Sequence, residues 1–165
     1  GQAVIYGLES YAEADFLRMM QPQNTNISGV LFANVAVIKS SYKASEITAV
    51  IGKQVEFVPK INLKSGLRVG YKQLKASFQY TYLSDQFTEA TNAVDGGVSA
   101  VVGLIPAYDI MDVSLSYAFR QFRLETSINN LADKAYFTRR ATGYPGPGIL
   151  PSDGRSFYLT LQAKF

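Results

Sequence analysis

Alternation of apolar and polar residues is the feature that most restricts how this chain can fold. The pattern is clearest at the end, where Phe157, Leu159, Leu161, Ala163 and Phe165 alternate with Ser156, Tyr158, Thr160, Gln162 and Lys164. A period of two is that of a β-strand with one face in an apolar medium and the other among polar groups. A soluble sheet and a barrel in a lipid bilayer both satisfy this pattern.

Seven segments alternate in this way, with varying clarity, and we predict a strand in each: residues 4–17, 28–40, 60–71, 74–84, 108–119, 122–130 and 156–165. We expect helix only in short pieces, around residues 44–50 or 131–136. No run of 18 apolar residues exists, which excludes a transmembrane helix. The sequence therefore predicts an all-β chain.

The composition excludes several kinds of functional site. The 165 residues include no cysteine and no histidine, so disulfides, thiolate or imidazole catalysis and histidine metal sites are all excluded. The 16 basic residues are scattered and the net charge is only +3, which argues against nucleic-acid binding. Asp85, Glu89 and Asp95 match no calcium-loop spacing and are interpreted as solvated loop acids. We therefore expect no enzyme activity, no cofactor and no bound metal.

The connections between the predicted strands alternate in length. Residues 72–73 and 120–121 are hairpin turns and residues 19–27 form a moderate turn, whereas 41–59, 85–107 and 132–155 are long. Tight turns on one rim and long loops on the other are typical of outer-membrane barrels, and long loops are uncommon inside compact soluble domains. This asymmetry favours antiparallel, up-and-down transmembrane β-barrel strands in contact with outer-membrane lipid.

Aromatic residues are predicted at two heights of the strands, as expected where rings straddle lipid and water. The rings expected at the short-turn rim are Phe16, Tyr71, Phe119, Phe122 and Phe165, and those toward the long-loop rim are Tyr6, Tyr80, Tyr82, Tyr108 and Phe157. The polar face carries charged residues that would line the interior and pair with each other: Glu9, Glu13, Asp15, Lys64, Arg68, Lys75, Arg123, Glu125 and Lys164. Glu9 with Glu13 has the composition of a glycosidase pair, but nothing positions a substrate there.

Seven strands is an odd number, whereas a closed bacterial barrel needs an even one. If the end of the chain is on the short-turn rim, an odd count places Gly1 on the long-loop rim. Either one strand escapes detection or this is the last part of a larger barrel, and we favour the second.

Residues 127–165 resemble the C-terminal end of TonB-dependent outer-membrane receptors. The resemblance rests on an N-N-L-x-D-K-x-Y motif, on a G-R-S-F-Y stretch at 154–158 and on a terminal aromatic residue; the motif residues here are Asn129, Asn130, Leu131, Asp133, Lys134 and Tyr136. Residues 52–71 are similar to a strand entry of the same family. Residues 144–158 look most like receptors for ferric chelates such as ferric citrate or siderophores.

This resemblance implies a bacterial outer-membrane location and uptake of a scarce nutrient with energy from TonB. The chain would hold about the last seven strands of a barrel of about 22. Residues 1–165 would be a C-terminal barrel segment without the plug domain. Its partners would be the rest of the barrel and its plug, TonB through the missing N-terminal part, the outer-membrane assembly machinery and a ferric-chelate ligand.

Two groups of candidate site residues follow from this resemblance. Arginines suit an anionic chelate, so we expect ligand contacts in the last long loop from Arg139, Arg140, Tyr144 and Arg155; lipopolysaccharide phosphates or plain solvation are the alternatives. The terminal strand resembles the signal that the assembly machinery reads, through Phe157, Tyr158, Leu159, Leu161 and Phe165; a girdle role for Phe165 is also open.

A soluble ligand-binding barrel resembling a lipocalin is the alternative from another class. That fold would turn the apolar face of every strand inward and the polar face to water. The orientation of the two faces therefore separates the hypotheses.

Overall fold

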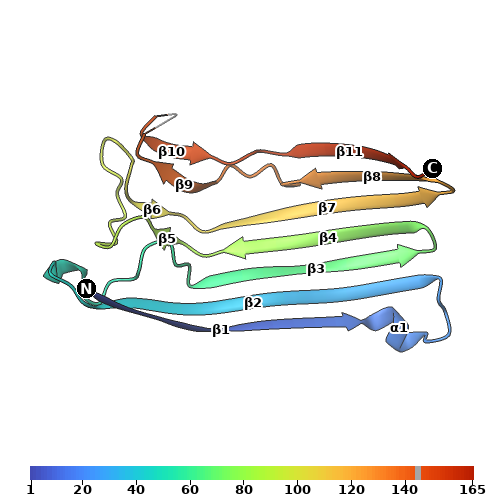
Figure 1. The fold of residues 1–165 in the computed structure, drawn as a ribbon, viewed down its shortest axis with the longest axis horizontal. Helices are drawn as coiled ribbons and strands as arrows, with labels where there is room; N and C mark the ends of the chain where they lie inside the picture. Colours follow the sequence, from blue (N-terminus) through green and yellow to red (C-terminus); the bar gives the residue numbers. More distant parts are fainter. Residues whose placement is uncertain (144–145) are drawn as a thin grey trace.

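The computed structural model describes residues 1–143 and 146–165 and consists mainly of one open antiparallel sheet (Figure 1). Its order is β1-β2-β3-β4-β7-β8-β11, so consecutive long strands are neighbours throughout. These strands are β1 (Gln2–Asp15), β2 (Ile27–Ala44), β3 (Ile61–Tyr71), β4 (Leu74–Leu83), β7 (Tyr108–Phe119), β8 (Phe122–Asn129) and β11 (Ser156–Ala163). The predicted all-β, up-and-down arrangement is confirmed.

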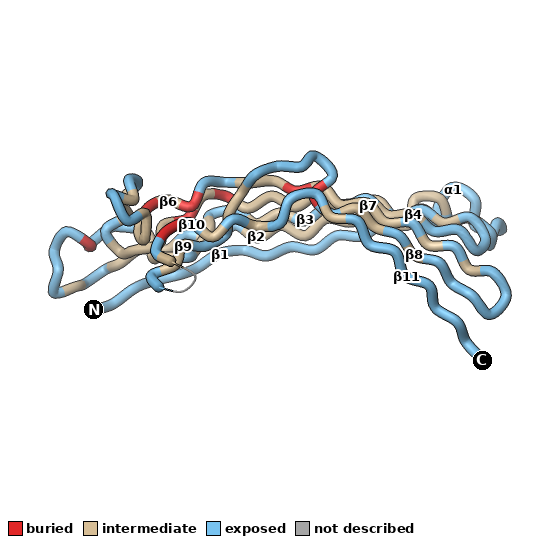
Figure 2. The backbone as a smooth tube through the Cα atoms, turned by 90° about the horizontal axis from the view of Figure 1, so that it is seen from above, coloured by how far each residue is buried: buried red, intermediate tan, exposed pale blue. Residues whose placement is uncertain are grey.

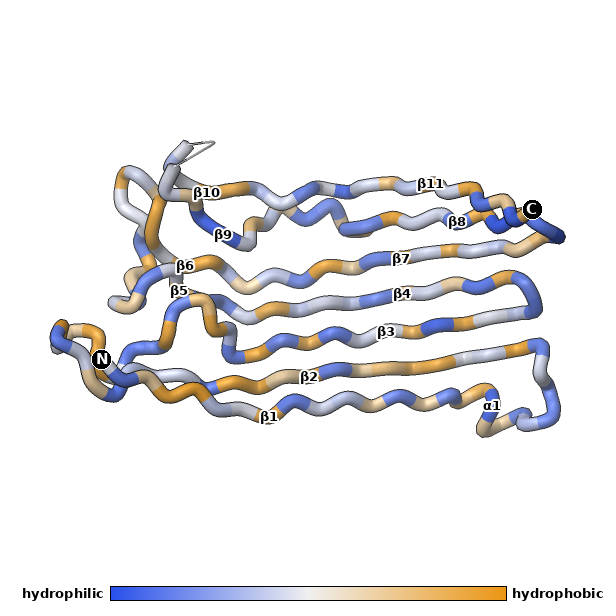
Figure 3. Tube along the Cα trace, in the orientation of Figure 1, coloured by the Kyte–Doolittle hydropathy of each residue, from blue (hydrophilic) through white to orange (hydrophobic). Residues whose placement is uncertain are grey.

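Strand register sorts the side chains onto two chemically distinct faces. Directly paired residues in antiparallel strands point to the same side of a sheet. One row of such partners crosses all seven strands and is apolar throughout: Ala14, Leu31, Leu67, Phe78, Val113, Ile128 and Phe157. The alternation of apolar and polar residues along each strand is visible in Figure 3. We call the side that carries this row the apolar face, and the other the polar face.

The apolar face is not covered by any other part of the described chain. Leu8 and Leu159 are each 74% exposed, whereas the buried apolar residues among those described are Val50, Ile105 and Ile110. Figure 2 shows the long strands as mostly exposed or half-buried and the sheet as bent. Because a soluble lipocalin-like barrel would enclose this face, the structure contradicts that alternative.

Short turns and long loops lie at opposite ends of the sheet, with the N-terminus at the long-loop end and the C-terminus at the short-turn end (Figure 1). At the short-turn end, Asp15 Oδ1 accepts a hydrogen bond from Arg18 N at 3.0 Å and caps helix α1 (Phe16–Met20). The first strand therefore ends at Asp15, not at residue 17. Phe16 lies in this helix and not in a strand. No helix in the described residues is long and apolar enough to cross a membrane.

The long loops contain structure that alternation did not predict. They hold the hairpin of β5 (Gln86–Phe87) with β6 (Leu104–Ile105) and the hairpin of β9 (Phe137–Ala141) with β10 (Gly148–Pro151). The helix expected around residues 44–50 is present in part, as the short 3-10 helix η1 (Thr48–Val50). The helix expected at 131–136 is wrong, because Asn130 and Asp133 have φ angles of 50° and 54°. Tyr108 is at the long-loop end, where β7 begins, as predicted, but it pairs with Leu83 on the polar face and so does not belong to a lipid-facing girdle. Its ring lies 4.8 Å from that of Tyr136.

Candidate ligand-binding loops and polar groove

Three long loops gather at one end of the sheet, and we name them loop A (45–60), loop B (84–107) and loop C (130–155). Asn92 of loop B joins loop A through two hydrogen bonds to the backbone of Gln54: its Oδ1 accepts from Gln54 N at 2.7 Å and its Nδ2 donates to Gln54 O at 2.8 Å. Phe57 N also donates to Phe87 O at 2.9 Å. Loops A and B are therefore joined by the side chain of Asn92 and by one hydrogen bond between their main chains.

Loop A is also held to the protruding end of β2. The last pair between β2 and β3 is Val37 with Ile61, and Tyr42 lies beyond it. Its hydroxyl donates to Glu56 Oε2 at 2.5 Å. This hydrogen bond raises the pKa of Tyr42, and burial and the negative charge of Glu56 raise it further. The phenol therefore stays neutral and keeps donating at physiological pH.

Arg140 joins loop C to loop B. Its Nη1 donates to Ala100 O and its Nη2 donates to Leu104 O, both at 2.8 Å. The guanidinium carbon of Arg140 lies 5.2 Å from the ring centroid of Phe137, and its buried Nε has no hydrogen-bond partner among the described residues. The guanidinium of Arg140 is therefore used to position loop B.

The other predicted ligand residues are placed differently. Arg139 precedes Arg140 in β9 and is exposed, as alternation along a strand requires. Arg155 is exposed between β10 and β11, and its backbone N–H donates to Asp133 Oδ1 at 2.8 Å. Tyr144 lies outside the described residues. The structure thus leaves the guanidinium groups of Arg139 and Arg155 accessible at the long-loop end.

The N-N-L-x-D-K-x-Y motif forms a turn at the end of β8 around one buried side chain, that of Asn130. Asn130 is only 3% exposed, and its side-chain Oδ1 accepts from Lys134 N at 2.9 Å while its Nδ2 donates to Lys134 O at 2.9 Å. Its backbone N–H donates to Asp112 Oδ1 at 2.9 Å, and Lys134 Nζ forms an ion pair with Asp109 Oδ1. The motif residues therefore connect β7 and β8 with the start of loop C.

A groove of about 550 Å³ runs along the polar face in the half nearer the short turns. Residues of all seven long strands line it, and many are hydroxyl-bearing or charged, among them Ser77, Ser114, Arg123, Glu125 and Thr160. Because the groove lies on the polar face, that face is the hollow side of the sheet. In a sheet closed around an apolar core, the apolar face would be the hollow side.

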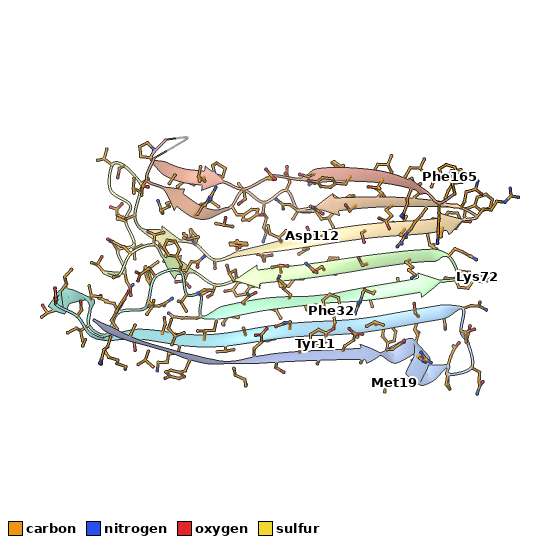
Figure 4. All side chains as sticks on the ribbon, in the orientation of Figure 1. Tyr11, Met19, Phe32, Lys72, Asp112 and Phe165 are labelled. Carbon is orange, nitrogen blue, oxygen red and sulfur yellow. The ribbon has the colours of Figure 1, made fainter. Side chains whose placement is uncertain are left out.

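Charged residues on the polar face pair with each other, as the sequence predicted. Arg68 lies 2.5 Å from Glu13 Oε2, which also accepts from the hydroxyl of Tyr11. The guanidinium of Arg68 lies 5.1 Å from the ring centroid of Phe32 (Tyr11 and Phe32 in Figure 4). A second pair, Arg123 Nε with Glu125 Oε1, is at 2.7 Å. Among the described residues no group of three or more potential ligand side chains could hold a metal ion.

The residues proposed as an assembly signal divide between the two faces. Phe157, Leu159 and Leu161 are 70%, 74% and 68% exposed on the apolar face. Tyr158 is on the polar face beside Ser127, and Phe165 extends beyond the end of β11.

The role of Asn92 and the structural role of Arg140 could not be predicted from the sequence. The acceptors of both are main-chain carbonyls in other loops, so no local pattern identifies them. A φ of 56° at Asn92 is common for asparagine, but nothing in the sequence shows which loop its amide meets.

The chain is similar in structure to part of several solved proteins. The unliganded ferric citrate transporter FecA matches with a TM-score of 0.86 and 23% identity, over 99% of this chain and 24% of its own. The ferric yersiniabactin uptake receptor FyuA from Yersinia pestis matches with a TM-score of 0.75 and 19% identity, over 99% and 24%. The fold is that of a TonB-dependent receptor barrel.

The siderophore receptor PiuA from Acinetobacter baumannii is similar in the same way, with a TM-score of 0.72 and 20% identity over 99% of this chain and 22% of its own. No protein-family model and no curated protein sequence matches the chain. The chain spans about a quarter of the length of the receptor structures that it matches. The predicted barrel-strand fold is therefore confirmed along nearly all of its residues.

Proposed function

We propose that this chain is the C-terminal barrel segment of a TonB-dependent receptor in a bacterial outer membrane, and that the receptor takes up a ferric chelate. The observation that carries this proposal is the uncovered apolar face, which crosses all seven strands while the hollow face is polar. Only a hydrocarbon environment makes that distribution favourable, because water would penalise so large an apolar surface.

The kind of cargo is supported by the fold comparison and by the loops. The similar solved structures include a ferric citrate transporter and two siderophore receptors, and also the copper transporter OprC with a TM-score of 0.68. Ferric citrate is anionic, and the exposed guanidinium groups of Arg139 and Arg155 are suited to its carboxylates. Tyr144 stays in the proposal as a hydrogen-bond donor from the same loop.

The partners follow from the same proposal. The first and last strands of the sheet would pair with the rest of the barrel, and the polar groove would face a plug domain. TonB would act through the N-terminal part of the receptor. The assembly machinery would recognise β11 and Phe165.

Uptake of iron by cells tests this function. Cells that carry the receptor gene should accumulate radioactive iron supplied as ferric citrate, and both gene deletion and loss of TonB should abolish this accumulation. Membrane fractionation should place the receptor in the outer membrane. Equal iron uptake with and without the gene would refute the ferric-citrate proposal, and gene-dependent uptake of copper alone would assign copper as the cargo.

A further inference from the structure

The two tight turns at the short-turn end are built in the same way. One reads Tyr71-Lys72-Gln73-Leu74 and the other Phe119-Arg120-Gln121-Phe122, so an aromatic residue, a cation, a glutamine and an apolar residue follow each other in both. Lys72 and Arg120 have φ angles of 52° and 51°. These φ angles belong to the left-handed region, which residues other than glycine and asparagine rarely adopt.

Both cations fold back over the ring that precedes them. Lys72 Nζ is 5.3 Å from the ring centroid of Tyr71, and the guanidinium carbon of Arg120 is 5.3 Å from that of Phe119. The two rings are on the apolar face, where they are 57% and 54% exposed. Because each cation lies over a ring of the apolar face, the positive charges are on the apolar side of the rim and not over the polar groove. Figure 4 shows Lys72 at the short-turn end of the sheet.

The charges at the two ends of the sheet also differ. Segments 15–27, 70–75, 117–124 and 162–165, at the short-turn end, contain one acidic residue, Asp15, whose carboxylate caps α1, and six basic residues: Arg18, Lys72, Lys75, Arg120, Arg123 and Lys164. Loops A, B and C together contain six basic and seven acidic residues. Only the short-turn end is therefore complementary to an anionic surface.

From these observations we infer that the short-turn rim binds the phosphate headgroups of anionic phospholipids through Lys72 and Arg120. This inference rests on the proposed membrane location and goes beyond the proposed transport. The exposed rings of Tyr71 and Phe119 lie at the depth where lipid meets water, and each cation next to them reaches the headgroup level. The exposed side chains of Met19 and Met20 add apolar surface at the same rim.

An acidic soluble partner is less compatible with this geometry. Such a partner would approach the end of the sheet from water, whereas Lys72 and Arg120 lie over rings of the apolar face. Cations that only kept the protein soluble would not need two turns with the same residue order and nearly the same positive φ at Lys72 and Arg120.

Native mass spectrometry of the purified full receptor tests the inference with two lipids of identical acyl chains, phosphatidylglycerol and phosphatidylcholine. The unchanged receptor should retain phosphatidylglycerol preferentially. The double variant Lys72→Gln with Arg120→Gln should lower the ratio of retained phosphatidylglycerol to phosphatidylcholine by about fivefold or more.

Two further variants separate the inference from its alternatives. The exchange Lys72→Arg with Arg120→Lys keeps both charges and should keep the ratio, which shows that loss of charge and not a damaged turn lowers it. Lys43→Gln with Lys53→Gln removes two exposed cations from the opposite end and should leave the ratio unchanged. An unchanged ratio in the Lys72 and Arg120 glutamine variant, or an equal fall in the Lys43 and Lys53 variant, would overturn the inference.

The test remains separate from the proposed transport. A receptor found in the outer membrane that fails to take up ferric citrate leaves the lipid preference measurable. A receptor absent from the outer membrane would instead defeat the proposed location, on which the lipid contact depends.

Discussion

Neighbouring arginines in β9 illustrate how a strand separates two roles at successive positions. Arg139 is exposed, whereas Arg140 is half-buried and donates to two carbonyl oxygens of loop B. Hydrogen bonds from a charged donor contribute about 1.5–3 kcal/mol each. Both hydrogen bonds that join loop B to loop C in the described residues are therefore made by the side chain of Arg140.

Replacement of Arg140 by alanine should release loop B. We expect backbone amides of residues 96–104 to exchange hydrogen at least about tenfold faster in the ligand-free receptor, since two charged hydrogen bonds are lost. Hydrogen exchange followed by mass spectrometry measures this rate. The matched change Arg139→Ala should leave exchange in that segment unchanged, and similar acceleration in both variants would contradict the assigned role of Arg140.

Replacement of the exposed arginines should instead affect the cargo. Arg139→Ala and Arg155→Ala should each weaken ferric citrate binding by on the order of tenfold, because each removes a charged donor for a carboxylate. Titration of the detergent-solubilised receptor with ferric citrate gives the dissociation constant. Affinity equal to that of the unchanged receptor in the double variant would exclude these two residues from the ligand site.

At the scale of elements, the turn that follows β8 depends on one buried amide. Asn130 adopts a φ of 50° and satisfies both the N–H and the C=O of Lys134. Alanine removes these hydrogen bonds and tolerates this backbone conformation poorly, so Asn130→Ala should destabilise the folded barrel by about 2–3 kcal/mol.

Unfolding by urea of the receptor refolded into lipid vesicles measures this change. Asn129→Ala alters the exposed neighbour of the same motif and should change stability by less than about 0.5 kcal/mol. If both variants lose the same stability, the motif does not act through the buried amide of Asn130.

The seven long strands were predictable because each has an apolar environment on one face and a polar environment on the other. Successive side chains point to opposite faces, so the sequence alternates with a period of two. The loops were not, because their structure depends on partners distant in sequence: Asn92 meets Gln54, and Arg140 meets Ala100. The end of β1 was missed for a local reason, since Phe16 follows Ala14 in the strand alternation while Asp15 caps a helix. In the candidate site, the arginines of loop C could be recognised from the sequence. That Arg140 is hydrogen-bonded to loop B while Arg139 and Arg155 are exposed could not be predicted from it.

For the whole molecule, the two faces of β11 offer a direct test of membrane orientation. Leu159 is on the apolar face and the adjacent Thr160 is on the polar face, and both are exposed. An arginine that faces lipid near the bilayer midplane costs about 2–4 kcal/mol, whereas one that faces a water-filled interior costs little.

Leu159→Arg should therefore lower the free energy of unfolding of the receptor in lipid vesicles by about 2 kcal/mol or more. Thr160→Arg adds the same charge one residue away and should lower it by less than about 1 kcal/mol. Urea titration followed by electrophoretic mobility of the folded barrel measures both values. A larger loss from Thr160→Arg would reverse the assignment of the faces.

Within the described residues, β1 and β11 each have one side without a partner strand. An open sheet with two unpaired edge strands can grow by pairing with further copies of itself on either side, and no symmetry closes the series. When prepared by itself in water, this stretch should consequently assemble into dye-binding fibrils, whereas in the proposed receptor the same two edges would pair with neighbouring strands and growth would stop.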